Sequence, residues 1–259
     1  MIGRRLPQRW RFPRFYIKER MSATMQRVLS LVRKAVDEYN LISDGDRIAV
    51  GVSGGKDSVL LLAALAALRR FYGKDFSLVG ITLDMGFDEK TDFTPLADFF
   101  AQRDIEYHVK KTEIGQIVFN VRNESSPCSL CARMRRGALH DEAKALGCNK
   151  LALGHNRDDL LETFVMNLLY EGRLGVFSPI TYLDRKDITV IRPLSFMPER
   201  DVVGAANRLE LPILHQACPA DGATSREDTK QMLAELEKNR RGSLDKIFGA
   251  IRRGHLSGW

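Results

Sequence analysis

The residues best suited to chemistry form a short loop of small, hydroxyl and charged side chains, Ser53–Ser58 (SGGKDS). Two glycines let backbone N–H groups approach an anion closely, and a helix that starts here adds a favourable dipole. Lys56 supplies a fixed positive charge, and Ser53 and Ser58 supply hydroxyl groups. A tight strand–helix turn would explain the glycines but not the Lys-Asp-Ser after them. The loop therefore predicts a phosphate-binding site.

Two common nucleotide-binding loops do not fit this segment. A Walker A loop has four residues between its first glycine and Gly-Lys, followed by Ser or Thr, whereas Asp57 follows Lys56 here. The dinucleotide pattern G-x-G-x-x-G is also absent. The loop thus indicates a different mode of phosphate binding.

A second polar segment, Gly154–Asp159 (GHNRDD), follows another apolar run and opens another helix. It is therefore expected at the same sheet edge as the first loop. Helix capping by Asn156 or Asp158 explains one of the acids, and we assign that role to Asp158. A lone histidine beside a strand end is more often structural than catalytic, so His155 is left out of the candidate site.

Three cysteines could form a metal or redox site: Cys128 and Cys131 in a Cys-x-x-Cys, and the distant Cys218. Three thiolates can hold an iron–sulfur cluster with one iron open. With His215 they would give a tetrahedral zinc site, and the Cys-x-x-Cys alone would suit redox chemistry. Cys148 follows a glycine at a predicted helix end and reads as a small buried hydrophobic residue.

These segments are spaced along an alternation of strand-like apolar runs and helical patterns. Strands are expected at 47–52, 77–84, 105–109, 150–154, 188–191 and 212–214. Helices are expected at 25–36, 58–70, 94–103, 132–146, 160–169, 200–209 and 227–253, the last broken near Gly242. This order predicts an α/β fold, a parallel sheet sandwiched by helices, with ligands beyond the carboxyl ends of the strands.

Charge is concentrated at the two ends of the 259-residue chain. Residues 1–20 carry a net +6 and residues 238–259 a net +5; the whole chain carries +7, so the body between them carries −4. The first arm mixes arginines with aromatic residues, which suits phosphate contact and base stacking, although a solvated tail explains it as well. We expect a basic arm at 1–21, a catalytic domain at 22–239 and a basic tail at 240–259.

The overall composition excludes several classes of protein. Apolar residues make up 44% of the chain, enough for a substantial core, and no run approaches the roughly 18 uncharged apolar residues of a membrane span. The basic start lacks the apolar stretch of a secretory signal. We therefore expect a cytoplasmic protein without membrane contact.

The sequence SGGKDS resembles the signature of the PP-loop ATP pyrophosphatases, which have a Rossmann-like domain of the adenine nucleotide alpha hydrolase type. The resemblance implies that Ser53–Ser58 hold the pyrophosphate of ATP, with Mg²⁺, while AMP is transferred to a substrate oxygen. It also implies nucleotide or Mg²⁺ contacts at Gly154 and Asp159, and Lys56 and Asp159 become candidate catalytic residues. The expected ATP contacts are Val52, Ser53, Gly54, Gly55, Lys56, Asp57, Ser58, Ile81, Gly154 and Asp159.

A longer match, from about Met21 to Lys238, resembles the tRNA 2-thiocytidine synthetase family in the blocks CSLCARMRRG, GHNRDD and IRPL and in the lone cysteine before Pro219. It implies that Cys128, Cys131 and Cys218 bind a 4Fe-4S cluster and that a tRNA cytidine near the anticodon loop is thiolated. A sister group that thiolates a T-loop uridine carries extra zinc-binding cysteine pairs at its ends, which are absent here. This chain departs from the cytidine group in having Cys218 alone where a Cys-x-x-Cys is familiar.

The resemblance implies that ATP adenylates the C2 oxygen of the pyrimidine and that a sulfide on the open iron displaces AMP. Arg135, four residues after Cys131, is the candidate for the α-phosphate, with a solvated surface arginine as the alternative. Arg133 and Arg136 are expected to face RNA or solvent. Expected partners are tRNA, a sulfur donor (desulfurase-derived or inorganic sulfide) and, as a homodimer, a second copy of the chain.

Three rivals stay open at this point. A PP-loop adenylating enzyme could act on another tRNA base, as a lysidine synthetase does, with zinc or no metal at the cysteines. An enzyme with the same cluster could act on a small molecule. A zinc-stabilised RNA-binding module that no longer turns over ATP is a third, although the intact Lys56-Asp57-Ser58 argues against it.

Overall fold

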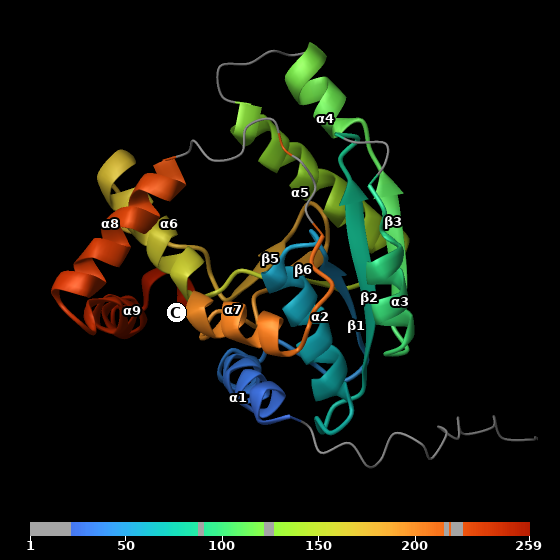
Figure 1. The fold of residues 1–259 in the computed structure, drawn as a ribbon, viewed down its shortest axis with the longest axis horizontal. Coiled ribbons are helices and arrows are strands. Elements are labelled where there is room, and N and C mark those ends of the chain that lie inside the picture. The colour runs from blue at the N-terminus through green and yellow to red at the C-terminus, as the bar shows by residue number, and fades with distance from the viewer. Residues whose placement is uncertain (1–21, 88–90, 122–126, 215–217, 219–224) are drawn as a thin grey trace, which may run out of the picture.

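The structure is a computed structural model that describes residues 22–259 except 88–90, 122–126, 215–217 and 219–224 (Figure 1). The strands are β1 Asp46–Gly51, β2 Phe76–Asp84, β3 Glu106–Lys111, β4 Lys150–Ala152, β5 Ile180–Leu183 and β6 Ile188–Ile191. The α-helices are α1 Ala23–Glu38, α2 Lys56–Arg69, α3 Thr94–Ala101, α4 Ile114–Gln116, α5 Pro127–Ala145, α6 Arg157–Tyr170, α7 Glu199–Arg208, α8 Ser225–Asn239 and α9 Ser243–Arg253. A π-helical turn covers Ile117–Val121 and a 3₁₀ turn covers Leu256–Gly258.

The strands form one sheet in the order β3-β2-β1-β4-β6-β5. All neighbouring pairs are parallel except β5 and β6, which form an antiparallel pair at one edge. The central strands β1 and β2 are buried along nearly their whole length because helices cover both of their faces. The predicted α/β fold with a mainly parallel sheet is confirmed.

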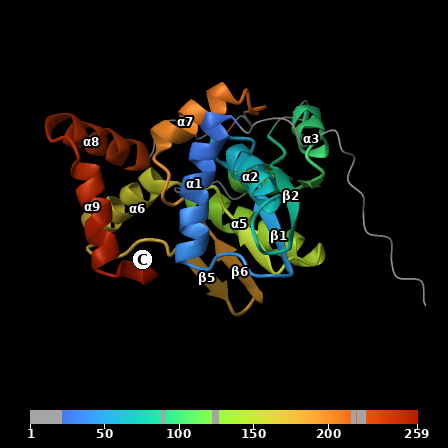
Figure 2. The same cartoon turned by 90° about the horizontal axis from the view of Figure 1, so that it is seen from below.

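Two layers of helices cover the sheet (Figures 1 and 2). Helices α1, α2 and α7 pack together on one face. Helix α2 is rich in Leu and Ala and has ten buried residues in its 14, so it lies between the sheet and its neighbours. Helix α5 covers the other face, where Leu139 and Ala143 contact Leu151 and Val190 in a separate apolar cluster. Helices α6, α8 and α9 contact one another and extend the first core.

The chain order places a topological switch point between β1 and β4. From β1 the chain moves outward through β2 and β3, then returns to β4 on the other side of β1. Ligands of such sheets bind at this point, beyond the carboxyl ends of the strands. The loop after β1 and the loop after β4 carry the two polar segments of the sequence, Ser53–Ser58 and Gly154–Asp159.

Several local predictions were wrong. Residues 212–214 form no strand, whereas β5 at Ile180–Leu183 was not predicted. Helix α5 begins at Pro127, so Cys128 and Cys131 lie in its first turns and not before it. The basic arm 1–21 and His215 lie outside the described residues. Within the described part of the chain, no helix is both long and apolar enough to cross a membrane.

Candidate functional site

The phosphate loop, Ser53–Ser58, leaves β1 in a direction that the next strand fixes. The Val52 N–H donates to the carbonyl of Ile81 over 2.8 Å. The Val52 carbonyl accepts from the Thr82 hydroxyl over 2.7 Å. The loop therefore starts from a backbone held on both sides at the edge of the sheet.

Both loop hydroxyl groups brace the turn. The Ser58 hydroxyl donates to the carbonyl of Gly55 over 3.0 Å and accepts from the Ser53 N–H over 3.1 Å. The two hydroxyl oxygens lie 3.1 Å apart. No side chain of the described residues caps the first turn of α2, which follows Gly55. The positive end of that helix is thus available to an anion.

Lys56 stands at the first position of α2 and is held by two carboxylates. Its Nζ lies 3.0 Å from Asp57 Oδ2 and 3.0 Å from Glu199 Oε1. Burial alone would lower the pKa of Lys56, but Asp57 and Glu199 together raise it above its ordinary value. The ammonium group therefore remains charged, and it can exchange a carboxylate for a phosphate oxygen.

Gly54 joins the phosphate loop to a segment far along the chain. Its carbonyl accepts from the Leu214 N–H over 2.9 Å, and its φ of +88° favours glycine. A β-carbon at this position would lie 2.6 Å from the Leu214 carbonyl oxygen. Leu214 thus contacts the phosphate loop, and residues 212–214 form no strand of the sheet.

Gly154 and Asn156 bring the second polar segment against the first. A β-carbon at Gly154 would lie 3.0 Å from the Ser58 nitrogen, so glycine permits this close approach. The Asn156 side chain donates to Asp57 Oδ1 over 2.8 Å. Its oxygen also accepts from the Asp158 and Asp159 N–H groups and caps α6. The structure brings the two predicted segments together at the switch point.

The capping role predicted for Asp158 was wrong. Asn156 is the N-cap of α6, and the carboxylate of Asp159 accepts from the Asn156 N–H over 2.9 Å to complete a capping box. Asp158 instead accepts from the Glu199 N–H over 2.8 Å at the first turn of α7. The two aspartates therefore hold the starts of two different helices.

Helix α8 is tied to this site by ion pairs that sequence reasoning missed. Arg226 lies 3.2 Å from Asp159 and 3.7 Å from Glu162, and Lys230 lies 2.9 Å from Glu199. Burial raises the pKa of Asp159, and burial followed by Asp159 raises that of Glu162 to about 7. The pairs connect residues far apart in the chain, so no local pattern marked them.

The three candidate cluster cysteines come from α5 and the segment before α8. Cys128 is exposed, and Cys131 and Cys218 are partly buried; all three are free thiols. Burial raises the pKa of Cys131, Arg135 lowers it, and the other two thiols raise it further, so the three lie within electrostatic reach. Among the described residues, no group of three or more Cys, His, Asp or Glu side chains is already arranged around a metal position.

The remaining candidates lie in different surroundings. Arg135 is exposed on α5. Ile81 is buried in the sheet face that packs on α5, and its carbonyl accepts from Val52. Cys148 is buried in the same apolar cluster, as predicted for a small hydrophobic residue.

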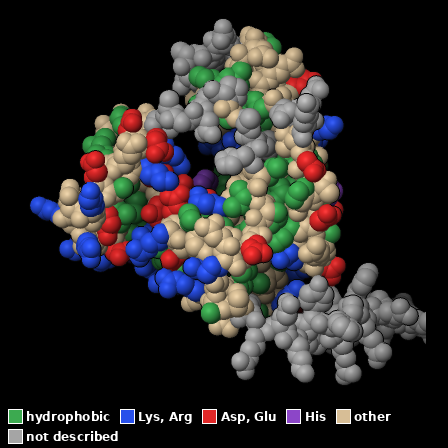
Figure 3. Space-filling view, in the orientation of Figure 1, with side chains coloured by type: hydrophobic (Ala, Val, Ile, Leu, Met, Phe, Trp, Pro, Cys, Tyr) green, Lys and Arg blue, Asp and Glu red, His purple; other side chains and the backbone are tan. Residues whose placement is uncertain are grey.

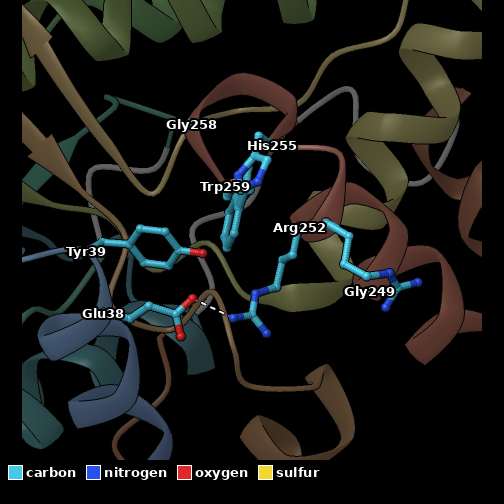
Figure 4. A pocket seen from close by; sticks show the side chains of 8 residues that line it. Glu38, Tyr39, Gly249, Arg252, His255, Gly258 and Trp259 are labelled. Carbon is cyan, nitrogen blue, oxygen red and sulfur yellow. Dashed lines mark hydrogen bonds and ion pairs between the residues drawn. The ribbon is translucent and has the colours of Figure 1, made fainter.

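A pocket of about 770 Å³ lies away from the phosphate loop, between the end of α1 and the end of α9. Glu38 and Tyr39 line one side, and Arg252, His255 and Trp259 line the other (Figure 4). Arg252 forms an ion pair with Glu38, and Tyr39 and Trp259 pack edge to face. These residues join α1 to the carboxyl-terminal segment and contain no part of the predicted site.

Comparisons with known proteins agree with this geometry. Residues 22–231 match the family model described as a PP-loop domain. The chain is 38% identical over 238 residues to the tRNA-cytidine(32) 2-sulfurtransferase of Geobacter sulfurreducens, covering 89% of this chain and 92% of that protein. It is 40% identical to the protein of the same name from Pelobacter propionicus, covering 89% and 88%.

A solved structure, the U34-tRNA thiolase NcsA from Methanococcus maripaludis with its [4Fe-4S] cluster, superposes with a TM-score of 0.72. The identity is 25%, and the match covers 89% of this chain and 78% of that one. Together with the phosphate loop at the switch point, these matches confirm the resemblance stated from the sequence: the chain belongs to the PP-loop family, in the same group as the tRNA-cytidine(32) 2-sulfurtransferases.

Proposed function

We propose that this protein is an ATP-dependent, iron–sulfur-dependent tRNA sulfurtransferase that replaces the C2 oxygen of a cytidine with sulfur. The relatives named as cytidine(32) sulfurtransferases support an anticodon-loop cytidine as the target. The oxygen attacks the α-phosphorus of ATP, and pyrophosphate leaves. Sulfide then adds at C2, and AMP departs with the original oxygen.

The observation that carries this proposal is the physical link between the phosphate loop and the segment that bears Cys218. Leu214, before Cys218, bonds to Gly54, and Arg226, after it, pairs with Asp159. Described residues before and after Cys218 in the chain thus both contact the nucleotide site. Such an arrangement suits a reaction in which activation and sulfur delivery happen at one place.

The roles of individual residues follow from charge and position. The loop N–H groups, the positive end of α2 and Lys56 would hold the pyrophosphate and stabilise its charge as it leaves. Asp159 would contact Mg²⁺ or the nucleotide once Arg226 moves to another partner, because both of its oxygens are engaged here. Arg135 would meet the adenylate from α5. Val52 and Gly154 would frame the nucleotide.

Cys128, Cys131 and Cys218 fit an iron–sulfur cluster by the chemistry of their donor atoms. Three thiolates would hold a 4Fe-4S cluster, which supplies one iron without a protein ligand where sulfide can be held. Arg135 favours the thiolate form of Cys131, as its opposing effect on the pKa of that thiol indicates. A zinc site would use the same three thiols plus His215.

The decisive test is anaerobic thiolation of a tRNA transcript with ATP and inorganic sulfide, followed by mass analysis of the nucleosides. We expect 2-thiocytidine, AMP and pyrophosphate, and brown protein with broad visible absorption. Cys128→Ala, Cys131→Ala and Cys218→Ala should each abolish the colour and the product. Cys148→Ala is the matched control and should keep both, since that thiol is buried away from the site.

Two outcomes would contradict the proposal. Colourless anaerobic protein with one zinc per chain, lost on His215→Ala, would remove the iron–sulfur step. Thiolation of another base or of a small molecule, with the tRNA cytidine unchanged, would leave the adenylating chemistry but reject the substrate.

A further inference from the structure

Arg192 lies directly after β6, at the same sheet edge as the phosphate loop. Its Nη1 donates to the Ser178 carbonyl over 2.6 Å and to the Thr181 hydroxyl over 3.4 Å. Its Nε donates to His155 Nδ1 over 3.3 Å, and its guanidinium carbon lies 5.0 Å from the centre of the Phe177 ring. All of these partners are neutral.

The sequence offers carboxylates that could pair with Arg192, but the described contacts of Arg192 include none. Two other partly buried arginines of this chain pair with carboxylates, Arg157 with Asp245 and Arg252 with Glu38. Arg192 has no ion pair among the described residues. Burial lowers the pKa of Arg192 to about 10, so it is still charged at neutral pH. A desolvated cation without a counter-ion is costly, and an incoming anion would remove that cost.

His155 offers a second donor beside Arg192. Because the Arg192 Nε can only donate, Nδ1 of His155 must accept, and the imidazole hydrogen stands on Nε2. The ring stacks on Phe177 at 5.0 Å with an interplanar angle of 30°. Burial, and then Arg192, Arg226 and Arg136, lower the pKa of His155 to about 3, so the ring is neutral. Nε2–H has no acceptor within the described part of the chain.

Three arginines lie within electrostatic reach of His155, and one of them, Arg226, pairs with Asp159 and Glu162. The arginines that act on His155 come from three elements: Arg192 after β6, Arg136 on α5 and Arg226 on α8. Arg136 is exposed, and its Nε donates to its own helix, at the Ala132 carbonyl. Figure 3 shows a hollow between the α6–α8 side and the sheet, with basic and acidic side chains and a histidine at its edge.

We propose that Arg192 and His155 form a phosphate-binding subsite, in which the Arg192 guanidinium and the His155 Nε2–H donate to oxygens of one phosphate group. His155 follows Gly154, which packs on Ser58, and Arg136 lies on the helix that starts with the cysteines. The subsite therefore lies beside the phosphate loop and within electrostatic reach of α5, the helix that carries Cys128 and Cys131. This inference rests on the proposed function, which supplies two sources of phosphate: the α-phosphate of the nucleotide and the backbone of the tRNA.

Two binding measurements on the full-length protein distinguish the sources. In the first, the thermal shift produced by AMP is measured without tRNA. In the second, the affinity of a tRNA transcript is measured without nucleotide at several salt concentrations. Arg192→Gln and His155→Phe are compared with the wild type in both measurements. A third variant, Arg192→Lys, keeps the positive charge but loses the planar set of guanidinium N–H donors. His155→Phe preserves a ring that can stack on Phe177 while removing the Nε2 donor.

We expect Arg192→Gln and His155→Phe to weaken binding in the same one of the two measurements. Loss of a charge-assisted bond from Arg192 corresponds to about 10- to 100-fold in affinity. A weaker AMP shift would assign the nucleotide phosphate. A weaker tRNA affinity with a salt slope smaller by about one would assign an RNA phosphate. Arg192→Lys should show an intermediate effect, because it retains the charge.

Arg69→Gln is the matched control. Its guanidinium is also partly buried and donates to backbone carbonyls, of Arg103 and Asp104, but at the far end of α2 from the phosphate loop. It should leave both binding measurements unchanged. Wild-type binding of AMP and tRNA by folded Arg192→Gln or Arg192→Lys would overturn the subsite. If the wild type still forms 2-thiocytidine in that case, the proposed function stands without it.

Discussion

Replacing Gly54 with alanine should break the contact between the phosphate loop and the segment that precedes Cys218. The new β-carbon would stand 2.6 Å from the Leu214 carbonyl oxygen and 3.0 Å from the Leu214 β-carbon. The first atom belongs to the backbone, so residue 214 must move as a whole. That movement would also stretch the hydrogen bond from Leu214 to the Gly54 carbonyl, now 2.9 Å.

The expected loss in the free energy of unfolding has two parts, backbone strain and overpacking. A second glycine, Gly45, allows the two to be separated. Gly54 has a φ of +88° and Gly45 a φ of +80°, but a β-carbon at Gly45 would meet no atom within 4 Å. Gly45→Ala therefore carries only the backbone strain, about 1–2 kcal/mol in the free energy of unfolding. Gly54→Ala carries similar strain plus overpacking, typically about 1–3 kcal/mol, so the total is about 2–5 kcal/mol.

Urea unfolding of both variants measures these free energies, and ATP binding and visible absorption of anaerobic protein follow the site. We expect Gly54→Ala to be less stable than Gly45→Ala, to bind ATP more weakly and to hold less iron–sulfur cluster. Gly45→Ala should keep ATP affinity and cluster content, since it lies before β1, at the opposite end of that strand. Equal loss of stability in the two variants, with an intact cluster in Gly54→Ala, would refute the reasoning.

Three further perturbations test the charges of the site. Lys56→Ala should abolish pyrophosphate release while circular dichroism shows an intact fold, and Lys144→Ala, on the far end of α5, should release pyrophosphate as the wild type does. Glu199→Gln should tighten ATP binding in titration calorimetry, because it frees Lys56 from a competing carboxylate 3.0 Å away; weaker binding would show that Glu199 positions the lysine. His155 has a folded pKa of about 3 against an ordinary 6.5, so its contribution to stability is present above pH 6.5 and lost as the pH falls. The free energy of unfolding of the wild type should therefore fall relative to that of His155→Gln by up to about 1.36 kcal/mol per pH unit below pH 6.5. If the two proteins lose stability in parallel as the pH falls, the pKa of His155 is not lowered.

The sequence was most informative where local chemistry decides the structure. The strand–loop–helix context of Ser53–Ser58 follows from an apolar run, two glycines and the start of an apolar helix, all close together in the sequence. The alternation of strands and helices also predicted that Gly154–Asp159 would share the edge of the sheet. The order of the strands then determined that the two segments meet.

The errors came from residues whose structure depends on distant partners. Residues 212–214 have strand-like composition, but their backbone bonds to Gly54 and joins no strand. The edge strand β5 is only four residues long, pairs with β6 and is partly exposed, so its length gave too little pattern to identify it. Three residues of the site were not predicted because they reach it through ion pairs between distant parts of the chain, which no local sequence pattern indicates: Arg226, Lys230 and Glu199.

The contacts of Gly54 with Leu214 and of Asp159 with Arg226 also determine when the site can form during synthesis of the chain. The phosphate loop leaves the ribosome early, whereas the residues that complete its surroundings lie in the last part of the chain. A nascent chain that ends before Leu214 contains the entire SGGKDS motif but lacks the third thiol, Cys218. It also lacks the ion pairs of α8 with Asp159 and Glu199. Since chains emerge amino terminus first, the site is assembled only after Leu214, Arg226 and Lys230 have emerged. A shorter chain would therefore carry the phosphate loop without the contacts of Leu214 and α8 that complete its surroundings.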